Sequence, residues 1–241
     1  IEKYLLNVNI SFTYTQNIWN ICKTKYSPHL ITNKIKHFVS NRTFIDIKKI
    51  EESKFVGGHF GLMPLDYMND PEIFCIIRNP IERFISYFKY TSGFMKDKNQ
   101  IYEKLENWLY GDQSKIQSNQ QSKFLTGSIN IEKFNENINF FQHSVNSGWY
   151  LENYSLKIDD ILKNIDNFYC YTLENQNLFL EDLNKSLNKH FRFTTFKNNY
   201  KANFSKNIDL KISNKNFDRI IEINEIDMKV YEYVQKNKKR Y

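Results

Sequence analysis

The segment 73–88, IFCIIRNPIERFISYF, constrains the fold of this chain more than any other part of the sequence. A short apolar strand runs into Arg78-Asn79-Pro80 and then directly into a helical pattern. Asn79 can cap a helix, Pro80 fits its first position, and Glu82 stands three residues after the cap. This turn therefore predicts a strand followed at once by a helix, which is the unit of an open α/β sheet.

The helix that follows has two different sides. Its apolar residues fall at i, i+3, i+4 and i+7, and we expect this stripe to pack against the sheet: Ile81, Phe84, Ile85 and Phe88. Arg83, Ser86 and Lys89 occupy the other side. Arg78 should lie beside the helix N-terminus, where free N–H groups and the macrodipole favour a phosphate or sulfate. Ser86, two turns further along, could donate a hydroxyl.

A second strand, Lys54 to Val56, runs into Gly57-Gly58-His59. In an open α/β sheet, ligands bind in the crevice outside the carboxyl ends of the strands. A histidine and an arginine delivered to that crevice would form an anion site with a titratable group beside it. Histidine has an unperturbed pKa of about 6.5, so it could act as a base at neutral pH.

The segment IIRNPIERFISYFKY resembles the 3′-phosphate-binding segment of sulfotransferases that use 3′-phosphoadenosine 5′-phosphosulfate (PAPS). The most similar group is the carbohydrate sulfotransferases related to heparan sulfate and uronyl 2-O-sulfotransferases, in which an Asp stands where this chain has Asn79. The resemblance implies that Arg78 and Ser86 bind PAPS and that His59, in GGHF, is the catalytic base. It implies transfer of a sulfuryl group from PAPS to a hydroxyl of a carbohydrate or of another hydroxyl acceptor, which we expect to be acidic, without a metal.

The resemblance also implies a fold, a P-loop NTPase-like three-layer α/β domain with a central, mainly parallel sheet, covering residues 1–241. Weaker similarities follow the family's order over 119–127, 167–183 and 203–233. Within the first of these, Gln120, Gln121 and Lys123 could line the acceptor cleft or belong to a solvated loop.

The N-terminus departs from the family, which opens with a strand and a Lys-Thr-Gly-Gly-Thr-like loop for the 5′-phosphosulfate. Residues 1–6 are typical of the helix that should follow such a loop, and no GxxxxGK[ST] pattern occurs. We therefore expect a domain truncated at its N-terminus, without the strand and the loop, rather than a relative that lacks them. Such a fragment should have negligible sulfotransferase activity alone.

Composition restricts the partners. The net charge of +7 suits PAPS or acidic glycans, and would also suit nucleic acid, but the charge is dispersed outside KNKKR at 236–240, so we expect no nucleic-acid binding. No apolar run reaches the roughly 18 residues of a membrane span. Cys75 and Cys170 lie in predicted strands and should be buried, and no cluster has metal-ligand spacing. The expected compartment is the cytoplasm for a bacterial or viral protein and the Golgi lumen for a eukaryotic one.

Two other classes of protein stay open. A P-loop kinase or NTPase would need a phosphate-loop lysine and a magnesium-binding Asp at a strand end, where this chain has Arg78. A non-catalytic module that binds acidic glycans or a nucleotide would not need His59.

Strands and helices are expected to alternate along the chain, which favours parallel pairing. The expected strands are 54–56, 73–77 and 168–173. The expected helices are 33–38, 46–52, 102–110, 155–164, 176–187 and 213–235. Loops are expected over 61–71 and 111–121.

Overall fold

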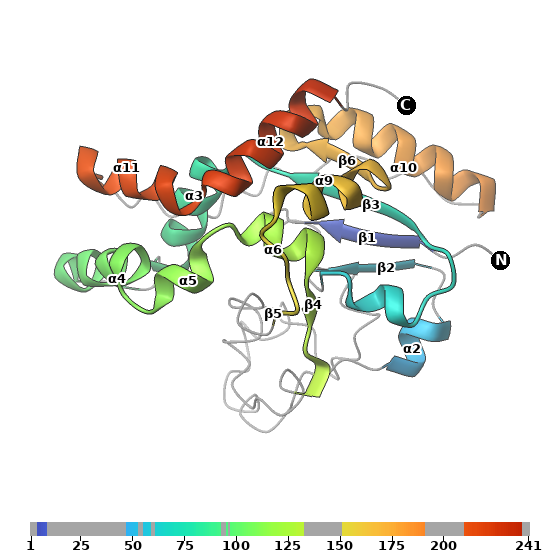
Figure 1. Cartoon of the computed structure of the whole chain (residues 1–241), viewed down its shortest axis with the longest axis horizontal. Coiled ribbons are helices and arrows are strands. Elements are labelled where there is room, and N and C mark those ends of the chain that lie inside the picture. Colours follow the sequence, from blue (N-terminus) through green and yellow to red (C-terminus); the bar gives the residue numbers. More distant parts are fainter. Residues whose placement is uncertain are drawn as a thin grey trace, which may run out of the picture.

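The computed structural model of the chain describes residues 4–8, 47–52, 55–58, 61–92, 95, 97–132, 151–190 and 210–237. Within them, four strands form one parallel sheet in the order β2-β1-β3-β6 (Figure 1). The strands are β1 (Tyr4–Val8), β2 (Phe55–Gly58), β3 (Glu72–Ile77) and β6 (Tyr169–Thr172). The protein is thus an α/β protein with a parallel sheet, as the alternation of elements predicts.

Strand β1 overturns the expectation of a helix over residues 1–6. It lies between β2 and β3, and its residue Leu6 is in register with Gly57 on one side and Phe74 on the other. A short apolar run cannot be assigned to a strand or a helix by its periodicity alone. Here the two neighbouring strands determine the strand conformation, because β2 and β3 both form hydrogen bonds with β1. The sheet therefore has the strand that the sequence was expected to lack.

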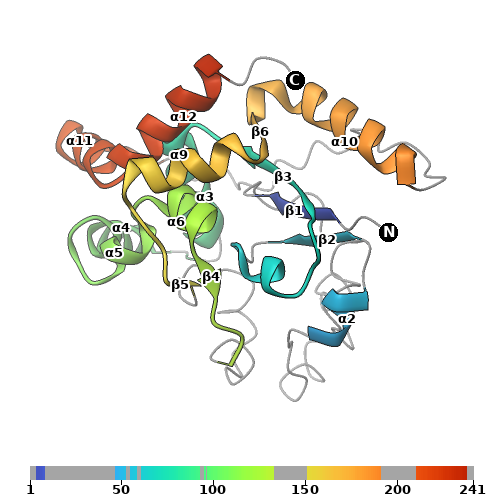
Figure 2. The ribbon, with the colours of Figure 1, turned by 45° about the vertical axis from the view of Figure 1, so that its right-hand side comes forward.

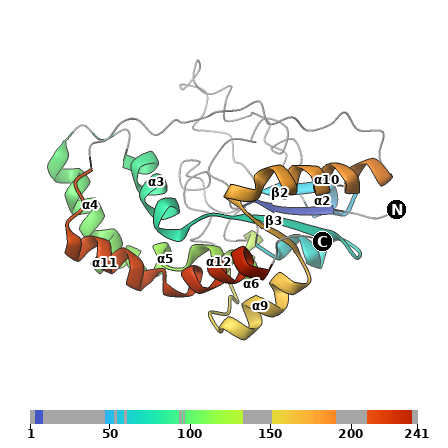
Figure 3. The same ribbon diagram turned by 90° about the horizontal axis from the view of Figure 1, so that it is seen from above.

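Helices cover both faces of the sheet (Figure 3). On one face, Phe74 and Ile76 of β3 pack with Phe179 and Leu183 of α10 (Gln176–His190). On the other face, the alternate residues of β3 pack against α9 (Ile158–Asp166), α6 (Gln120–Thr126) and α12 (Glu225–Asn237). This period of two is the alternation of a strand that is buried on both faces. Cys75 and Cys170 are buried on the same face, as expected.

A separate helical cluster lies beyond the end of the sheet. It joins α3 (Pro80–Ser92), α4 (Lys98–Tyr110) and α11 (Asn214–Ile223), which Figure 3 shows beyond the end of β3 that leads into α3. In Figure 2, α4 and α11 lie at the left of the molecule and α10 at the right. Phe84 and Phe88 of α3 pack edge-on against Trp108 of α4, with ring centroids 5.7 and 5.2 Å apart. The apolar stripe of α3 therefore packs into a core, with Phe84 and Phe88 buried and Ile81 and Ile85 partly buried, but against α4 and α11 instead of the sheet. Sequence periodicity shows which residues are buried and not which partner covers them.

The remaining elements are short. They are α2 (Ile47–Glu52), η3 (Met63–Asp66), α5 (Gln113–Gln117), β4 (Ser128–Ile129), β5 (Leu151–Glu152) and η5 (Leu173–Asn175). Helices α5 and α6 occupy much of the expected loop over 111–121, and the single helix expected over 213–235 is broken at Asn224 into α11 and α12. The helix expected over 33–38 lies outside the described residues. In the part of the chain that the structure describes, no helix combines the length and the apolar character needed to cross a bilayer.

Candidate anion site at the end of strand β3

The site is positioned by the order of the strands. Along the chain, β2 is added on one side of β1 and β3 on the other, so the direction of the connections reverses between β1 and β3. In open α/β sheets, this reversal opens a crevice at the carboxyl ends of the strands, and ligands bind there. Arg78 is the residue that directly follows β3 at this edge. Strands β2 and β3 both end at this edge, but β1 lies between them, so their ends are separated by two strand spacings, about 10 Å.

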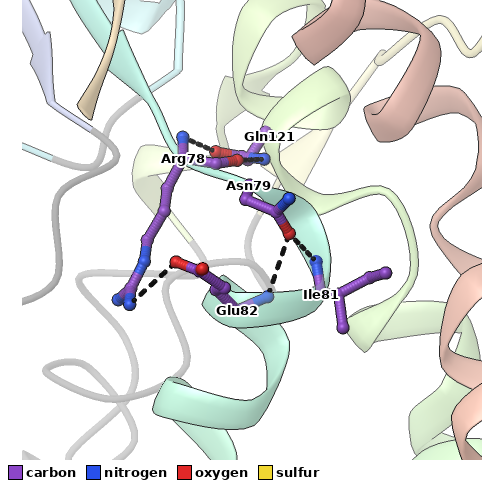
Figure 4. Close-up of polar contacts among 5 residues, drawn as sticks. All are labelled: Arg78, Asn79, Ile81, Glu82 and Gln121. Carbon is purple, nitrogen blue, oxygen red and sulfur yellow. Dashed lines mark hydrogen bonds and ion pairs between the residues drawn. The ribbon is translucent and has the colours of Figure 1, made fainter. Parts of the chain in front are cut away.

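Asn79 caps helix α3, as the sequence predicts (Figure 4). Its Oδ1 accepts hydrogen bonds from the backbone N–H groups of Ile81, at 3.1 Å, and Glu82, at 3.2 Å. In a full capping box the Glu82 carboxylate would accept from the backbone N–H of Asn79, but here it pairs with the Arg78 side chain. These two N–H groups are used by the cap, so they do not offer the free donors that we expected for a ligand. The Arg78 side chain has to provide most of the attraction for an anion.

Among the described residues, the Arg78 guanidinium forms one polar contact, an ion pair with Glu82. Its Nη2 lies 3.5 Å from Oε2 of Glu82, in an ion pair whose carboxylate side chain is 62% exposed. An exposed pair of this kind contributes little free energy. The buried Nε of Arg78 has no hydrogen-bond partner among the described residues. The Arg78 side chain is 23% exposed. A guanidinium carries five N–H donors, so Arg78 has donors beyond the one paired with Glu82 that could bind a phosphate or sulfate.

The main chain of Arg78 is held by Gln121 of α6, from the opposite direction to its side chain (Figure 4). The N–H of Arg78 donates to Oε1 of Gln121 at 2.7 Å, and Nε2 of Gln121 donates to the carbonyl of Arg78 at 2.9 Å. Gln121 is 1% exposed, so it lines no open cleft. The whole of Gln120–Leu125 is buried within α6, and the solvated loop proposed for this segment is therefore wrong.

The other two predicted site residues, Ser86 and His59, have no described contact with Arg78. No hydrogen bond joins the half-buried Ser86 to Arg78 among the described residues, and Ser86 stands eight positions further along α3. His59 lies outside the described residues, one position after the end of β2 at Gly58. The structure thus places Arg78 at the strand edge that the sequence indicated, and it describes the strand that leads to His59.

Arg83, which the sequence places on the side of α3 opposite the apolar stripe, points into the protein. It is buried, and its Nη1 donates to Oε1 of Gln120 at 2.6 Å. Burial lowers the pKa of the Arg83 guanidinium, while attraction to the carboxylate of Asp227 opposes that shift. Arg83 is therefore part of an internal polar layer.

This polar layer joins α6 and α12 by two reciprocal caps. The carboxylate of Asp227 accepts from the N–H groups of Gln121, at 3.0 Å, and Ser122, at 2.7 Å, and from the Ser122 hydroxyl at 2.6 Å. In return, Oδ1 of Asn119 accepts from the N–H groups of Ile226 and Asp227, both at 3.0 Å. The first turn of α12 thus supplies the carboxylate that caps α6, and the residue before α6 supplies the amide oxygen that caps α12. This cap explains why α12 begins as a new helix after Asn224.

Lys123 belongs to the same buried layer. Its amino group donates to the carbonyl of Lys115 and lies 3.4 Å from the Ser118 hydroxyl. Burial lowers the pKa of Lys123 to about 8, against the attraction of Asp227. Lys123, like Gln121, is engaged by the protein itself.

Comparison of the sequence with protein-family models and with curated proteins found no match. Sequence reasoning missed Asn119 and Asp227. A signal for Asp227 was present, since it falls among the buried positions of the amphipathic helix α12, with Val230, Tyr231 and Val234. A carboxylate in such a stripe needs buried donors.

Proposed function

We propose that this protein binds PAPS at the crevice between β1 and β3 and transfers its sulfuryl group to a carbohydrate hydroxyl. The observation that carries the proposal is the placement of Arg78. It follows the strand at the topological switch point, and Nε has no partner among the described residues. A charged guanidinium of this kind matches the oxygens of a phosphate. The resemblance of the segment around Arg78 to a 3′-phosphate-binding segment supports the same ligand.

In the proposed reaction, the hydroxyl oxygen of the acceptor attacks sulfur, and the bond between sulfur and the 5′-phosphate oxygen breaks. The hydroxyl proton passes to the imidazole of His59, and 3′-phosphoadenosine 5′-phosphate (PAP) leaves with the electron pair. His59 directly follows β2, whose end lies at the same edge of the sheet as Arg78. The proposal includes the finer fold class, a P-loop NTPase-like three-layer domain.

A second candidate is a module that binds a nucleotide or an acidic glycan without transferring a sulfuryl group. One observation favours it. The loop of the sulfotransferase family that cradles the 5′-phosphosulfate follows the first strand, and among the described strands the first along the chain is β1. After β1, the first lysine is Lys23 and the first glycine is Gly57. A phosphosulfate loop normally relies on backbone N–H groups freed by glycines and on a lysine charge.

A transfer assay separates the two candidates. The protein is incubated with PAPS labelled in its sulfuryl group and with a panel of acidic glycans, and labelled glycan is measured beside PAP binding. Transfer that falls about 10² to 10⁴-fold in His59→Ala, with PAP affinity unchanged, is expected for the sulfotransferase. PAP binding without any transfer would refute the proposed activity of residues 1–241, and it is the result expected for the non-catalytic module or for a domain without its phosphosulfate loop. Transfer retained in full by His59→Ala would refute the role of His59.

A further inference from the structure

The main chain of Arg78 is anchored to a helix that is far away in the sequence. Gln121 and Arg78 exchange two hydrogen bonds, N–H to Oε1 and Nε2–H to carbonyl, at 2.7 and 2.9 Å. Oε1 and Nε2 of a glutamine amide reproduce the acceptor and donor of a peptide group. The Gln121 side chain therefore takes the place of a neighbouring strand for the first residue beyond β3, and it fixes the point from which the guanidinium projects.

Gln121 is itself fixed at both its ends. Its side chain binds Arg78, and its own N–H donates to Oδ2 of Asp227 at 3.0 Å. Asp227 has no exposed surface, and its helix start is bound in turn by Asn119. The connection from α12 through Asp227 and Gln121 to Arg78 consists entirely of hydrogen bonds between residues that are at least partly buried. Little rotamer freedom is left in it.

We propose that Gln121 is a positioning residue for Arg78 and that the reciprocal caps of α6 and α12 hold it in place. The inference rests on the proposed function in naming PAP as the ligand. The physical reason is that a long arginine side chain loses conformational entropy when it binds an anion. Fixing its main chain in advance removes the backbone part of the ordering cost and sets the point from which the guanidinium projects toward the crevice. Gln121 touches no ligand and acts through the Arg78 peptide.

Calorimetric titration with PAP tests this role in a double-mutant cycle. Gln121→Met keeps the length of the side chain and removes both hydrogen bonds, and it should weaken PAP binding roughly five- to thirtyfold. In an Arg78→Ala background, the same change should have an effect of less than about twofold, because the group that it positions is gone. Gln117→Met is the matched control, since Gln117 is equally buried in the neighbouring helix and bonds Gln120 and not Arg78. An equal loss in both backgrounds would show a general structural role and would overturn the proposal.

Amide hydrogen exchange provides a readout that needs no ligand. The N–H of Arg78 should exchange at least about tenfold faster in Gln121→Met than in the wild type, because its acceptor is removed. The N–H of Ile76, inside β3, should not change. If Gln121→Met does not fold, Gln121→Ala serves in its place, since it also removes the acceptor of the Arg78 N–H and places no apolar chain against the Arg78 peptide. Failure of the wild type to bind PAP would refute the proposed function, whereas unchanged exchange at Arg78 would refute the positioning role.

Discussion

Replacing Asp227 by asparagine should destabilise the protein by about 2–4 kcal/mol. The substitution keeps the size of the side chain and removes its charge. If the amide oxygen takes the place of Oδ1, it still accepts from the Ser122 N–H and hydroxyl, now without charge. The amide nitrogen then faces the N–H of Gln121, and two donors meet where a charge-assisted hydrogen bond of 3.0 Å stood. One such bond contributes about 1.5–3 kcal/mol, and the weakening of the other two adds to the loss.

The loss is measured by urea unfolding followed by tryptophan fluorescence and circular dichroism. Glu225→Gln is the matched control, because Glu225 lies in the same helix, is exposed and pairs only with Lys229 among the described contacts. It should change the free energy of unfolding by less than about 0.5 kcal/mol. A loss below about 1 kcal/mol for Asp227→Asn, or equal losses for both variants, would refute the reciprocal caps as a major source of stability.

Three further outcomes are expected. Asn119→Ala should lower the free energy of unfolding by about 2–3 kcal/mol, because it removes two hydrogen bonds and places alanine at a φ of 44°, which alanine disfavours. Asn119→Gly should lower the free energy of unfolding by less, because glycine adopts this φ without strain. The pKa of Lys123 is lowered to about 8 from 10.5, so above pH 8 the unfolded chain binds a proton that the folded one has released, and stability rises with pH. Between pH 8 and 10 the wild type should gain about 2 kcal/mol relative to Lys123→Met in urea unfolding, and parallel pH profiles would contradict this. Glu82→Gln should tighten PAP binding about twofold in calorimetry, because it removes a carboxylate that competes for Arg78, and weaker binding would contradict that competition.

Local sequence rules sufficed for the turn at Arg78. Its cap depends on residues within three positions of Asn79, and the structure reproduces it. Strands β3 and β6 and helix α10 also follow from periodicity, because their apolar patterns are long or bounded clearly. The buried state of Phe84 and Phe88 was equally predictable.

The failures share a cause, which is dependence on distant partners. Strand β1 is a strand only because β2 and β3 flank it, and the expected helix had no such information. The reciprocal caps join residues 105 to 108 positions apart, so no local pattern around Asn119 could reveal them. Arg83 shows the same limit, since its helical position permitted exposure and the neighbouring helix buried it.

The central claim is that the Arg78 guanidinium reads the 3′-phosphate of a nucleotide at the end of β3. Calorimetric titration of the wild type and Arg78→Ala with PAP and with adenosine 5′-phosphate tests it most directly, with Arg219→Ala as a control for loss of positive charge on α11. The account predicts that Arg78→Ala weakens PAP binding roughly ten- to a hundredfold and leaves adenosine 5′-phosphate binding nearly unchanged. Equal losses for the two nucleotides, or no loss for PAP, would contradict it.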